Sequence, residues 1–153
     1  MIKKFYFAHN FEDRIEFRQL ELQLEKELGI ELFNPFYDDP NRIDEMKELD
    51  ADNTNSRERM AQLAHTTNKF NRTQDQAIDI VRRDLKNLAA QEGLFTYVKK
   101  PSFGTSIEIC NAVMMKMPVY FVSEVYSMHP WIKVYADYVF KSIEEFKECF
   151  KLE

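Results

Sequence analysis

KKPSFGTSIEICNAVMMKM, residues 99–117, lies between two strand-like runs, FTYV at 95–98 and PVYFV at 118–122. The order is therefore strand, loop, helix, strand, which is typical of a parallel α/β unit. Pro101 cannot donate to a sheet ladder and Gly104 permits a close backbone approach, so we predict that residues 101–105 form the loop. In such sheets, ligands bind outside the carboxyl ends of the strands, where a loop of this kind meets its helix.

The helix after this loop carries one acidic residue near its start, Glu108. We predict that Thr105 caps the helix, whose apolar residues recur at helical spacing at Ile107, Cys110, Met114 and Met117. Glu108 would then lie in the first turn, where Thr105-x-x-Glu108 fits a capping box. A carboxylate beside a ligand-binding loop can also serve a reaction. The spacing favours the structural role and leaves the chemical one open.

Strand-like and helix-like segments alternate along the rest of the chain. We predict strands at residues 3–8, 30–33 and 137–140, a helix that ends at Gly29, a helix at 74–90 capped by Thr73, and a last helix capped by Ser142. Right-handed crossovers then favour a doubly wound α/β fold, flavodoxin-like or Rossmann-like, with about five parallel strands and helices on both faces.

Residues 38–73 form a polar insertion in this alternation. A loop of that length without structure is unusual in a compact domain, so we expect at least one short helix, near residues 56–64. The DADN run at 50–53 lacks the glycine and the terminal glutamate of a calcium loop, and no metal site is predicted there. At 153 residues, the chain is expected to be one domain that includes this insertion.

Composition narrows the classes of partner. The net charge is −5 and no Lys/Arg-rich block occurs, which argues against a nucleic-acid polymer. No apolar run approaches the ~20 residues of a membrane span, and the MIKK start lacks the apolar core of a signal peptide, so a cytoplasmic location without membrane contact is expected. Cys110 and Cys149 lack metal-type spacing and are predicted to be buried or idle thiols.

The motif PSFGTSIEI at residues 101–109, followed by a helix of small residues and Pro-Val-Tyr, resembles the nucleoside 2-deoxyribosyltransferase superfamily. That superfamily includes the 2′-deoxynucleoside 5′-monophosphate N-hydrolases. The resemblance spans most of the chain, but only residues 99–122 carry a specific motif. It implies that Glu108 is the nucleophile. Asp84-Leu85, ahead of the third strand, resembles an Asp-Leu pair whose aspartate handles the nucleobase; a solvated acid paired with Arg83 is the structural alternative.

The resemblance implies further site residues. Tyr6 occupies a position where a tyrosine can contact the nucleophilic glutamate, although it could equally be a buried strand residue. The first strand-loop-helix unit, with Phe7 and His9, would help to build the sugar and base pocket. Ser102 and Gly104 would bind substrate from the loop. His129 falls where relatives place a polar residue that reaches into a neighbouring subunit's pocket, and a merely packed or exposed histidine is the alternative.

The implied chemistry is a retaining glycosyl transfer, which needs a carboxylate near the anomeric carbon and a proton donor near the departing base. Glu108 would hold the 2′-deoxyribosyl group as an ester, and Asp84, kept protonated by partial burial, would assist the leaving nucleobase. A second nucleobase, or water, would resolve the ester, without a metal or organic cofactor. The implied partners are a nucleoside or nucleotide, a free nucleobase, and further copies of the chain in a homodimer or larger even-numbered oligomer.

Ser102 departs from the superfamily's pattern, because members that act on free nucleosides often carry an acid six residues before the nucleophile. A Pro-Ser pair resembles the monophosphate N-hydrolases instead, where hydroxyls and backbone amides at a helix N-terminus hold the phosphate. The Gly-Ser pair and arginine cluster often found in such enzymes are replaced here by AHNF at residues 8–11. We therefore expect a nucleoside 2-deoxyribosyltransferase, with a monophosphate N-hydrolase and a non-catalytic nucleotide-binding or interaction domain as the alternatives.

Overall fold

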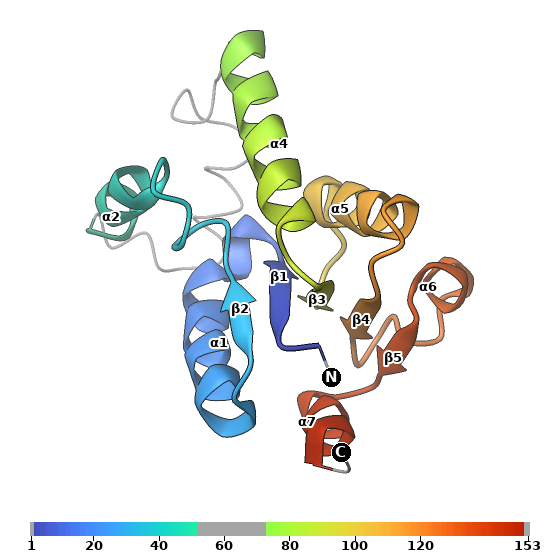
Figure 1. The fold of residues 1–153 in the computed structure, drawn as a ribbon. Coiled ribbons are helices and arrows are strands. Elements are labelled where there is room, and N and C mark those ends of the chain that lie inside the picture. Colours follow the sequence, from blue (N-terminus) through green and yellow to red (C-terminus); the bar gives the residue numbers. More distant parts are fainter. Residues whose placement is uncertain (1, 52–72, 152–153) are drawn as a thin grey trace.

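Five parallel strands form the centre of the fold (Figure 1). The computed structural model describes residues 2–51 and 73–151; the helix expected near residues 56–64 lies outside them. The sheet has the order β2-β1-β3-β4-β5 and every neighbouring pair is parallel. Its strands are β1 (Lys4–Ala8), β2 (Glu31–Phe33), β3 (Gly93–Tyr97), β4 (Val119–Val122) and β5 (Tyr138–Phe140). The predicted doubly wound α/β fold is confirmed.

Helices cover both faces of the sheet (Figure 1). One face carries α1 (Arg14–Leu28) and α7 (Ile143–Lys151), and the other carries α4 (Gln74–Ala89) and α5 (Phe103–Met114), with α6 (Pro130–Tyr135) beside α5. A short 3-10 helix, η1 (Phe11–Asp13), leads into α1, and α2 (Ile43–Ala51) follows β2. None of the helices in the described part of the chain is long and apolar enough to span a membrane.

Alternate residues of β1 belong to two separate hydrophobic clusters, because successive side chains of a strand face opposite sides of its sheet. Phe5 and Phe7 lie in the cluster under α1 and α7. Tyr6 and Ala8 lie in the cluster under α4 and α5. Tyr6 and Ala8 therefore face the helix that carries Glu108, and of the two only Tyr6 has a polar group to offer it.

Most of the predicted helix ends are confirmed. Gly29 ends α1 in the left-handed conformation, with φ 68°. Thr73 caps α4 in a reciprocal capping box with Gln76. Ser142 Oγ accepts a hydrogen bond from the Glu145 amide at the start of α7. The apolar residues of α4 are only partly buried, since Leu88 is fully covered whereas Val81 is 52% exposed, and the outer half of the helix extends past the sheet (Figure 1).

The start of α5 differs from the prediction. Its N-cap is Ser102, whose Oγ accepts a hydrogen bond from the Thr105 amide at 3.3 Å, so residues 103–105 are helical and do not form a loop. Serine is a somewhat better N-cap than threonine, and Ser102 has the extended backbone that this position requires. The prediction that Thr105 caps the helix is wrong. Gly104 consequently lies in the first turn of α5 rather than in a loop.

Two glycine substitutions should have opposite effects on stability. Gly29→Ala should lower the free energy of unfolding by about 1 kcal/mol, because an L-residue is strained in the left-handed conformation although open space surrounds its Cβ. Gly104→Ala should raise it by about 0.5 kcal/mol, because a helical glycine has more conformational freedom to lose on folding and its Cβ would also meet nothing within 4 Å. Urea unfolding of both variants measures this; a change of the same sign in both would contradict the helix boundaries described above.

Candidate active site

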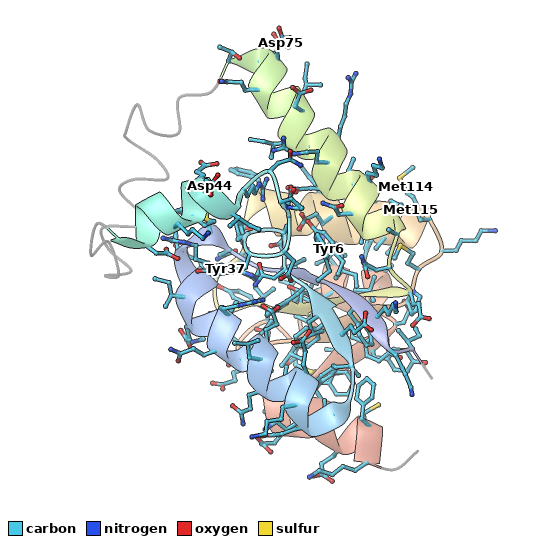
Figure 2. All side chains as sticks on the ribbon, turned by 60° about the vertical axis from the view of Figure 1, so that its left-hand side comes forward. Tyr6, Tyr37, Asp44, Asp75, Met114 and Met115 are labelled. Atoms are coloured by element: carbon cyan, nitrogen blue, oxygen red, sulfur yellow. The ribbon has the colours of Figure 1, made fainter. Side chains whose placement is uncertain are left out.

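A hydrogen bond joins Tyr6 to Glu108 between the sheet and α5. Tyr6 Oη donates to Glu108 Oε1 at 2.7 Å. Tyr6 is fully buried and Glu108 is partly buried. Figure 2 shows Tyr6 in the interior, whereas Asp44 on α2 and Asp75 at the outer end of α4 lie at the periphery. The tyrosine-glutamate contact that the resemblance implied is therefore present.

Glu108 takes no part in a capping box. Because α5 begins at Phe103, Glu108 lies in the second turn, beyond the backbone amides that a helix start leaves unpaired. The side chain that caps the start of α5 is Ser102, whose Oγ accepts the hydrogen bond of the Thr105 amide. The capping role that spacing had favoured for Glu108 is wrong, and the partner of its carboxyl group is the Tyr6 hydroxyl.

Burial determines the protonation of this pair. It raises the pKa of Glu108 to about 8; the hydrogen bond from Tyr6 opposes this rise and the negative charge of Asp84 adds to it. Burial, followed by the charge of Glu108, also raises the pKa of Tyr6 above its ordinary range, so Tyr6 remains a hydrogen-bond donor. Glu108 can thus gain or lose its proton near neutral pH, while Tyr6 keeps its own.

Asp84 forms an ion pair with Arg42. Asp84 Oδ2 lies 2.9 Å from Arg42 Nη2, and the two side chains are only 17% and 8% exposed. Burial raises the pKa of Asp84, and the charge and hydrogen bond of Arg42 work against that rise. Arg83, the partner expected if Asp84 were merely structural, lies instead 3.5 Å from Asp39.

Arg42 is the site residue that the sequence analysis missed. It lies in the polar segment 38–73, where no hydrophobic periodicity marks which side chain turns inward. Its guanidinium stands 5.4 Å above the Phe36 ring, and Nη1 lies 3.5 Å from the Pro35 carbonyl oxygen. The only signal in the sequence is the Pro40-Asn41-Arg42 turn that precedes α2.

A second ion pair anchors the segment that carries Arg42. Arg14 on α1 is fully buried, and its Nη2 lies 2.7 Å from Asp50 Oδ1 near the end of α2. Tyr37, in the turn between β2 and α2, also contacts Asp50, at 3.3 Å. Arg14 is fully buried and Asp50 is 30% exposed, so this half-buried pair, together with the Tyr37 contact, links α2 to α1 and helps to position the turn that carries Arg42.

Four groups therefore share one site: Tyr6, Glu108, Asp84 and Arg42. Their charges interact, since Asp84 raises and Arg42 lowers the pKa of both Tyr6 and Glu108. A carboxyl group oriented by a phenol can serve as a nucleophile, and a carboxylate beside a guanidinium can bind a polar leaving group. The sequence analysis had placed Glu108, Asp84 and Tyr6 in one site, and the structure brings these three together.

Phe7 and His9 lie on the other face of the sheet from Tyr6. Phe7 is fully buried against Phe17 and Phe95. His9 is 5% exposed with its ring 4.7 Å from that of Phe7, and burial lowers its pKa to about 4. Both side chains are buried, and no described contact joins either of them to Glu108; that they bind substrate stays a prediction.

Ser102 stands at the N-terminus of α5, where Ser106 Oγ donates to its carbonyl oxygen at 2.8 Å. A cavity of about 490 Å³ opens beside it, with Asn10 and Lys100 in its wall. Gly104 lies two residues further along, in the first turn of α5; it is exposed, and a Cβ there would meet nothing within 4 Å. No close approach within the described chain explains this glycine.

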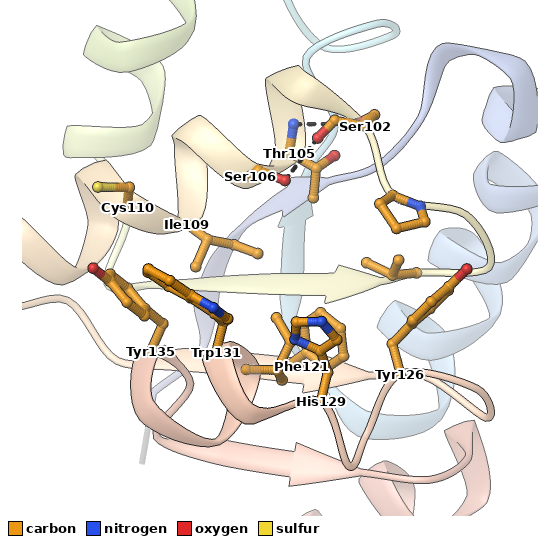
Figure 3. A pocket seen from close by; sticks show the side chains of 13 residues that line it. Ser102, Thr105, Ser106, Ile109, Cys110, Phe121, Tyr126, His129, Trp131 and Tyr135 are labelled. Carbon is orange, nitrogen blue, oxygen red and sulfur yellow. Dashed lines mark hydrogen bonds between the residues drawn. The ribbon is translucent and has the colours of Figure 1, made fainter.

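A second cavity, of about 430 Å³, lies between α5 and α6 (Figure 3). Its wall includes Trp131, stacked on Tyr135 with ring centroids 6.0 Å apart, and His129, the exposed N-cap residue of α6. Glu108 and Asp84 do not line it. The structure thus does not bring His129 to the Glu108 site of its own chain, and its role toward a neighbouring subunit stays a prediction.

Among the described residues, no group of three or more His, Cys, Asp or Glu side chains could hold a metal ion. Cys110 is exposed and Cys149 is half-buried.

No protein-family model matches the chain, and no curated protein is significantly similar to it. The choice of reaction therefore depends on the geometry and charges of the four site residues.

The pKa of Glu108 predicts a pH-dependent contribution to stability. Its pKa is higher in the folded protein, about 8, than the ordinary 4.5, so the folded state binds this proton more tightly. The contribution is fully present below pH 4.5 and is lost as the pH rises through 8. Glu108→Gln should therefore gain stability relative to the wild type between about pH 5 and pH 9, measured by urea unfolding.

Glu21→Gln provides the control for this experiment. Burial also raises the pKa of Glu21 to about 8, but this carboxyl lies on α1, away from the site. A double variant should show the Glu108→Gln effect on top of the Glu21→Gln effect, because separated sites act additively. Parallel pH profiles for the wild type and Glu108→Gln would show that Glu108 is not perturbed.

Proposed function

We propose that this protein is a nucleoside 2-deoxyribosyltransferase, which cleaves the N-glycosidic bond of a 2′-deoxynucleoside and passes the sugar to another nucleobase. The observation that carries the proposal is the hydrogen bond from the buried Tyr6 hydroxyl to Glu108, in a site shared with Asp84. Glu108 lies in the second turn of α5, where it caps no backbone amide, and its carboxyl group accepts a hydrogen bond from the Tyr6 hydroxyl instead. The sequence motif around Glu108 supplies the substrate class.

The reaction proceeds in two displacements at C1′ of the sugar. In the first, Glu108 as carboxylate attacks C1′, the bond from C1′ to the base nitrogen breaks, and its electron pair leaves with the base. In the second, a nitrogen of the incoming base attacks C1′ and gives up its N–H proton, and the bond to Glu108 breaks, which restores the carboxylate. The proton lost here balances the proton that the departing base takes up. Tyr6 holds Oε1, so that Oε2 is the oxygen aimed at the sugar. Asp84, whose charge acts on Glu108, would assist the departing base.

Replacement of Glu108 by glutamine tests the nucleophile. Glu108→Gln keeps the size of the side chain and an oxygen for Tyr6 but cannot form the ester. Turnover should fall by several orders of magnitude while the fold is retained, because loss of a nucleophile removes the reaction path rather than an ordinary contact. Chromatography of products from each deoxynucleoside, with and without a free base, measures turnover.

A mechanism-based substrate provides the second readout. With a 2′-fluoro-arabinosyl nucleoside, the wild type should gain the mass of one sugar and Glu108→Gln should not. Glu21→Gln, which removes another buried carboxyl, is the matched control and should form the adduct. Normal turnover in Glu108→Gln would remove the proposed reaction. A bound nucleoside without base release would favour a non-catalytic nucleotide-binding domain of the same fold.

A 2′-deoxynucleoside 5′-monophosphate N-hydrolase is the second candidate. The observation that favours it is the group at the N-terminus of α5, where Ser102, Ser106 and Lys100 line the 490 Å³ cavity. Helix N-termini, hydroxyls and an ammonium group suit a phosphate. In this reaction water, in place of a second base, would resolve the ester.

Ser102→Asp separates the two candidates. Aspartate caps helices about as well as serine, so α5 should be preserved, but its charge would repel a phosphate bound at Ser102. If monophosphates are the substrates, the ratio of kcat/KM for monophosphate to that for nucleoside should fall at least about tenfold. Ser142→Asp, the same change at the N-cap of α7, is the control. An unchanged ratio in Ser102→Asp would count against a phosphate at this helix.

We also infer a homodimer or larger even-numbered oligomer of this chain. Several large apolar side chains on α5 and α6 are exposed, among them Phe103 at 91%, Trp131 at 68% and Val134 at 80%. Exposed apolar groups of this size on adjacent helices are typical of a protein interface. In such an assembly, His129 at the start of α6 is the residue that would approach a neighbour's site.

A further inference from the structure

The ion pair between Arg42 and Asp84 leaves hydrogen-bonding groups unused. Asp84 Oδ2 binds Arg42, but Asp84 Oδ1 is buried and accepts no hydrogen bond from the described residues. A guanidinium has five N–H donors, and the described contacts of Arg42 are one to Asp84 and a long one, 3.5 Å, to the Pro35 carbonyl oxygen. A buried acceptor without a partner costs free energy, and a bound molecule that donated a hydrogen bond to Asp84 Oδ1 would remove this cost.

The buried carboxylate of Glu21 shows how a purely structural group of this fold differs. Glu21 Oε1 accepts from Arg18 at 2.5 Å, and Glu21 Oε2 accepts from Asn34 at 2.7 Å. Both oxygens are satisfied within the chain. Asp84 is also largely buried, but only its Oδ2 accepts a hydrogen bond from the described residues.

The Arg42–Asp84 pair also belongs to the Glu108 site. The charge of Arg42 acts on Glu108 and on Tyr6, which places the guanidinium within the electric field of the reacting groups. Aromatic rings accompany the pair. The Phe36 ring lies 5.4 Å from the Arg42 guanidinium carbon, and the half-buried Phe33 ring stacks on Tyr6 at 6.1 Å. A planar heterocycle bound here would meet one cation, one carboxylate and flat apolar surface.

We propose that Arg42 and Asp84 together bind the nucleobase through one edge. An Arg42 N–H donates to a ring nitrogen or carbonyl oxygen of the base, and Asp84 Oδ1 accepts from the adjacent N–H. This inference rests on the proposed function for the identity of the ligand. The chemical class that it selects is a base edge with a donor next to an acceptor, either the amidine edge of adenine and cytosine or the lactam edge of hypoxanthine and uracil.

This arrangement changes the part that Asp84 plays in the reaction. Beside Arg42, Asp84 acts as an acceptor that orients the base and need not supply a proton. The electron pair of the broken bond moves onto the base, the fixed charge of Arg42 stabilises it, and the base takes its proton from water when it leaves the site.

Binding of unreactive base analogues tests the inference directly. We would titrate the wild type by NMR with 9-methyladenine, 9-methylhypoxanthine and 9-methylpurine, the last of which has no donor on its edge. At least one of the first two should bind about tenfold or more tightly than 9-methylpurine, the effect of one charge-assisted hydrogen bond. The pyrimidine arm compares 1-methylcytosine and 1-methyluracil with 1-methylpyrimidin-2-one, and selectivity in either arm identifies the base class.

Arg42→Gln should bring that selectivity to within about threefold of unity, because Asp84 loses the partner that keeps it charged and in place. Arg82→Gln, the same substitution at an exposed position of the helix that carries Asp84, should retain the selectivity. If Arg42→Gln folds poorly, Arg42→Gln/Asp84→Asn removes both charges and should fold while still failing to select.

The outcomes are separable. The inference is overturned if selectivity survives in Arg42→Gln or in the double variant. It is also overturned if the wild type binds no analogue, or binds 9-methylpurine and 1-methylpyrimidin-2-one as tightly as the other analogues. If the selectivity depends on Arg42 but the wild type forms no covalent sugar adduct, the base site stands and the transferase function fails. If the adduct forms and the selectivity does not depend on Arg42, the function stands and this inference fails.

Discussion

The carboxyl group of Glu108, buried against the Tyr6 hydroxyl, is the constraint on which the rest of the site depends. A carboxyl removed from water is costly unless it is hydrogen-bonded, and Tyr6 provides the bond at 2.7 Å. That contact requires β1 to turn Tyr6 toward α5 and requires α5 to begin directly after its N-cap Ser102, so that its second turn lies over the strand. The face of β1 on which Tyr6 lies and the residue at which α5 starts therefore together place the Glu108 carboxyl group beside the Tyr6 hydroxyl.

Arg42 reaches the same site from the turn between β2 and α2. Its position depends on contacts made elsewhere, chiefly the half-buried pair of Arg14 and Asp50, which links α2 to α1. Two ion pairs thus connect α1, α2 and α4 across the carboxyl end of the sheet. Such pairs add little net stability compared with apolar packing, but they permit few alternative arrangements once the surrounding core has formed.

The sequence predicted the sheet, its strand-helix alternation and most helix ends, because these depend on local periodicity and capping. It also predicted the contact of Tyr6 with Glu108, through resemblance. The choice of Ser102 over Thr105 as N-cap was missed because both residues can cap and only the packing of α5 decides between them. The alternation of a strand also predicts that Phe7 lies on the face opposite Tyr6, where the structure has it. Arg42 could not be found, since its partner lies 42 residues away in the chain.

The length of α4 has a consequence for how the site moves. Its first turns, from Gln74 to Asp79, are exposed throughout, whereas Leu88 near its other end is fully buried. Asp84 lies between these halves. Amide hydrogens should therefore exchange with solvent progressively more slowly along the helix, and the outer turns can unwind and re-form while the turn that carries Asp84 stays in place. The exposed turns of α4 can therefore change conformation without moving the carboxylate of Asp84.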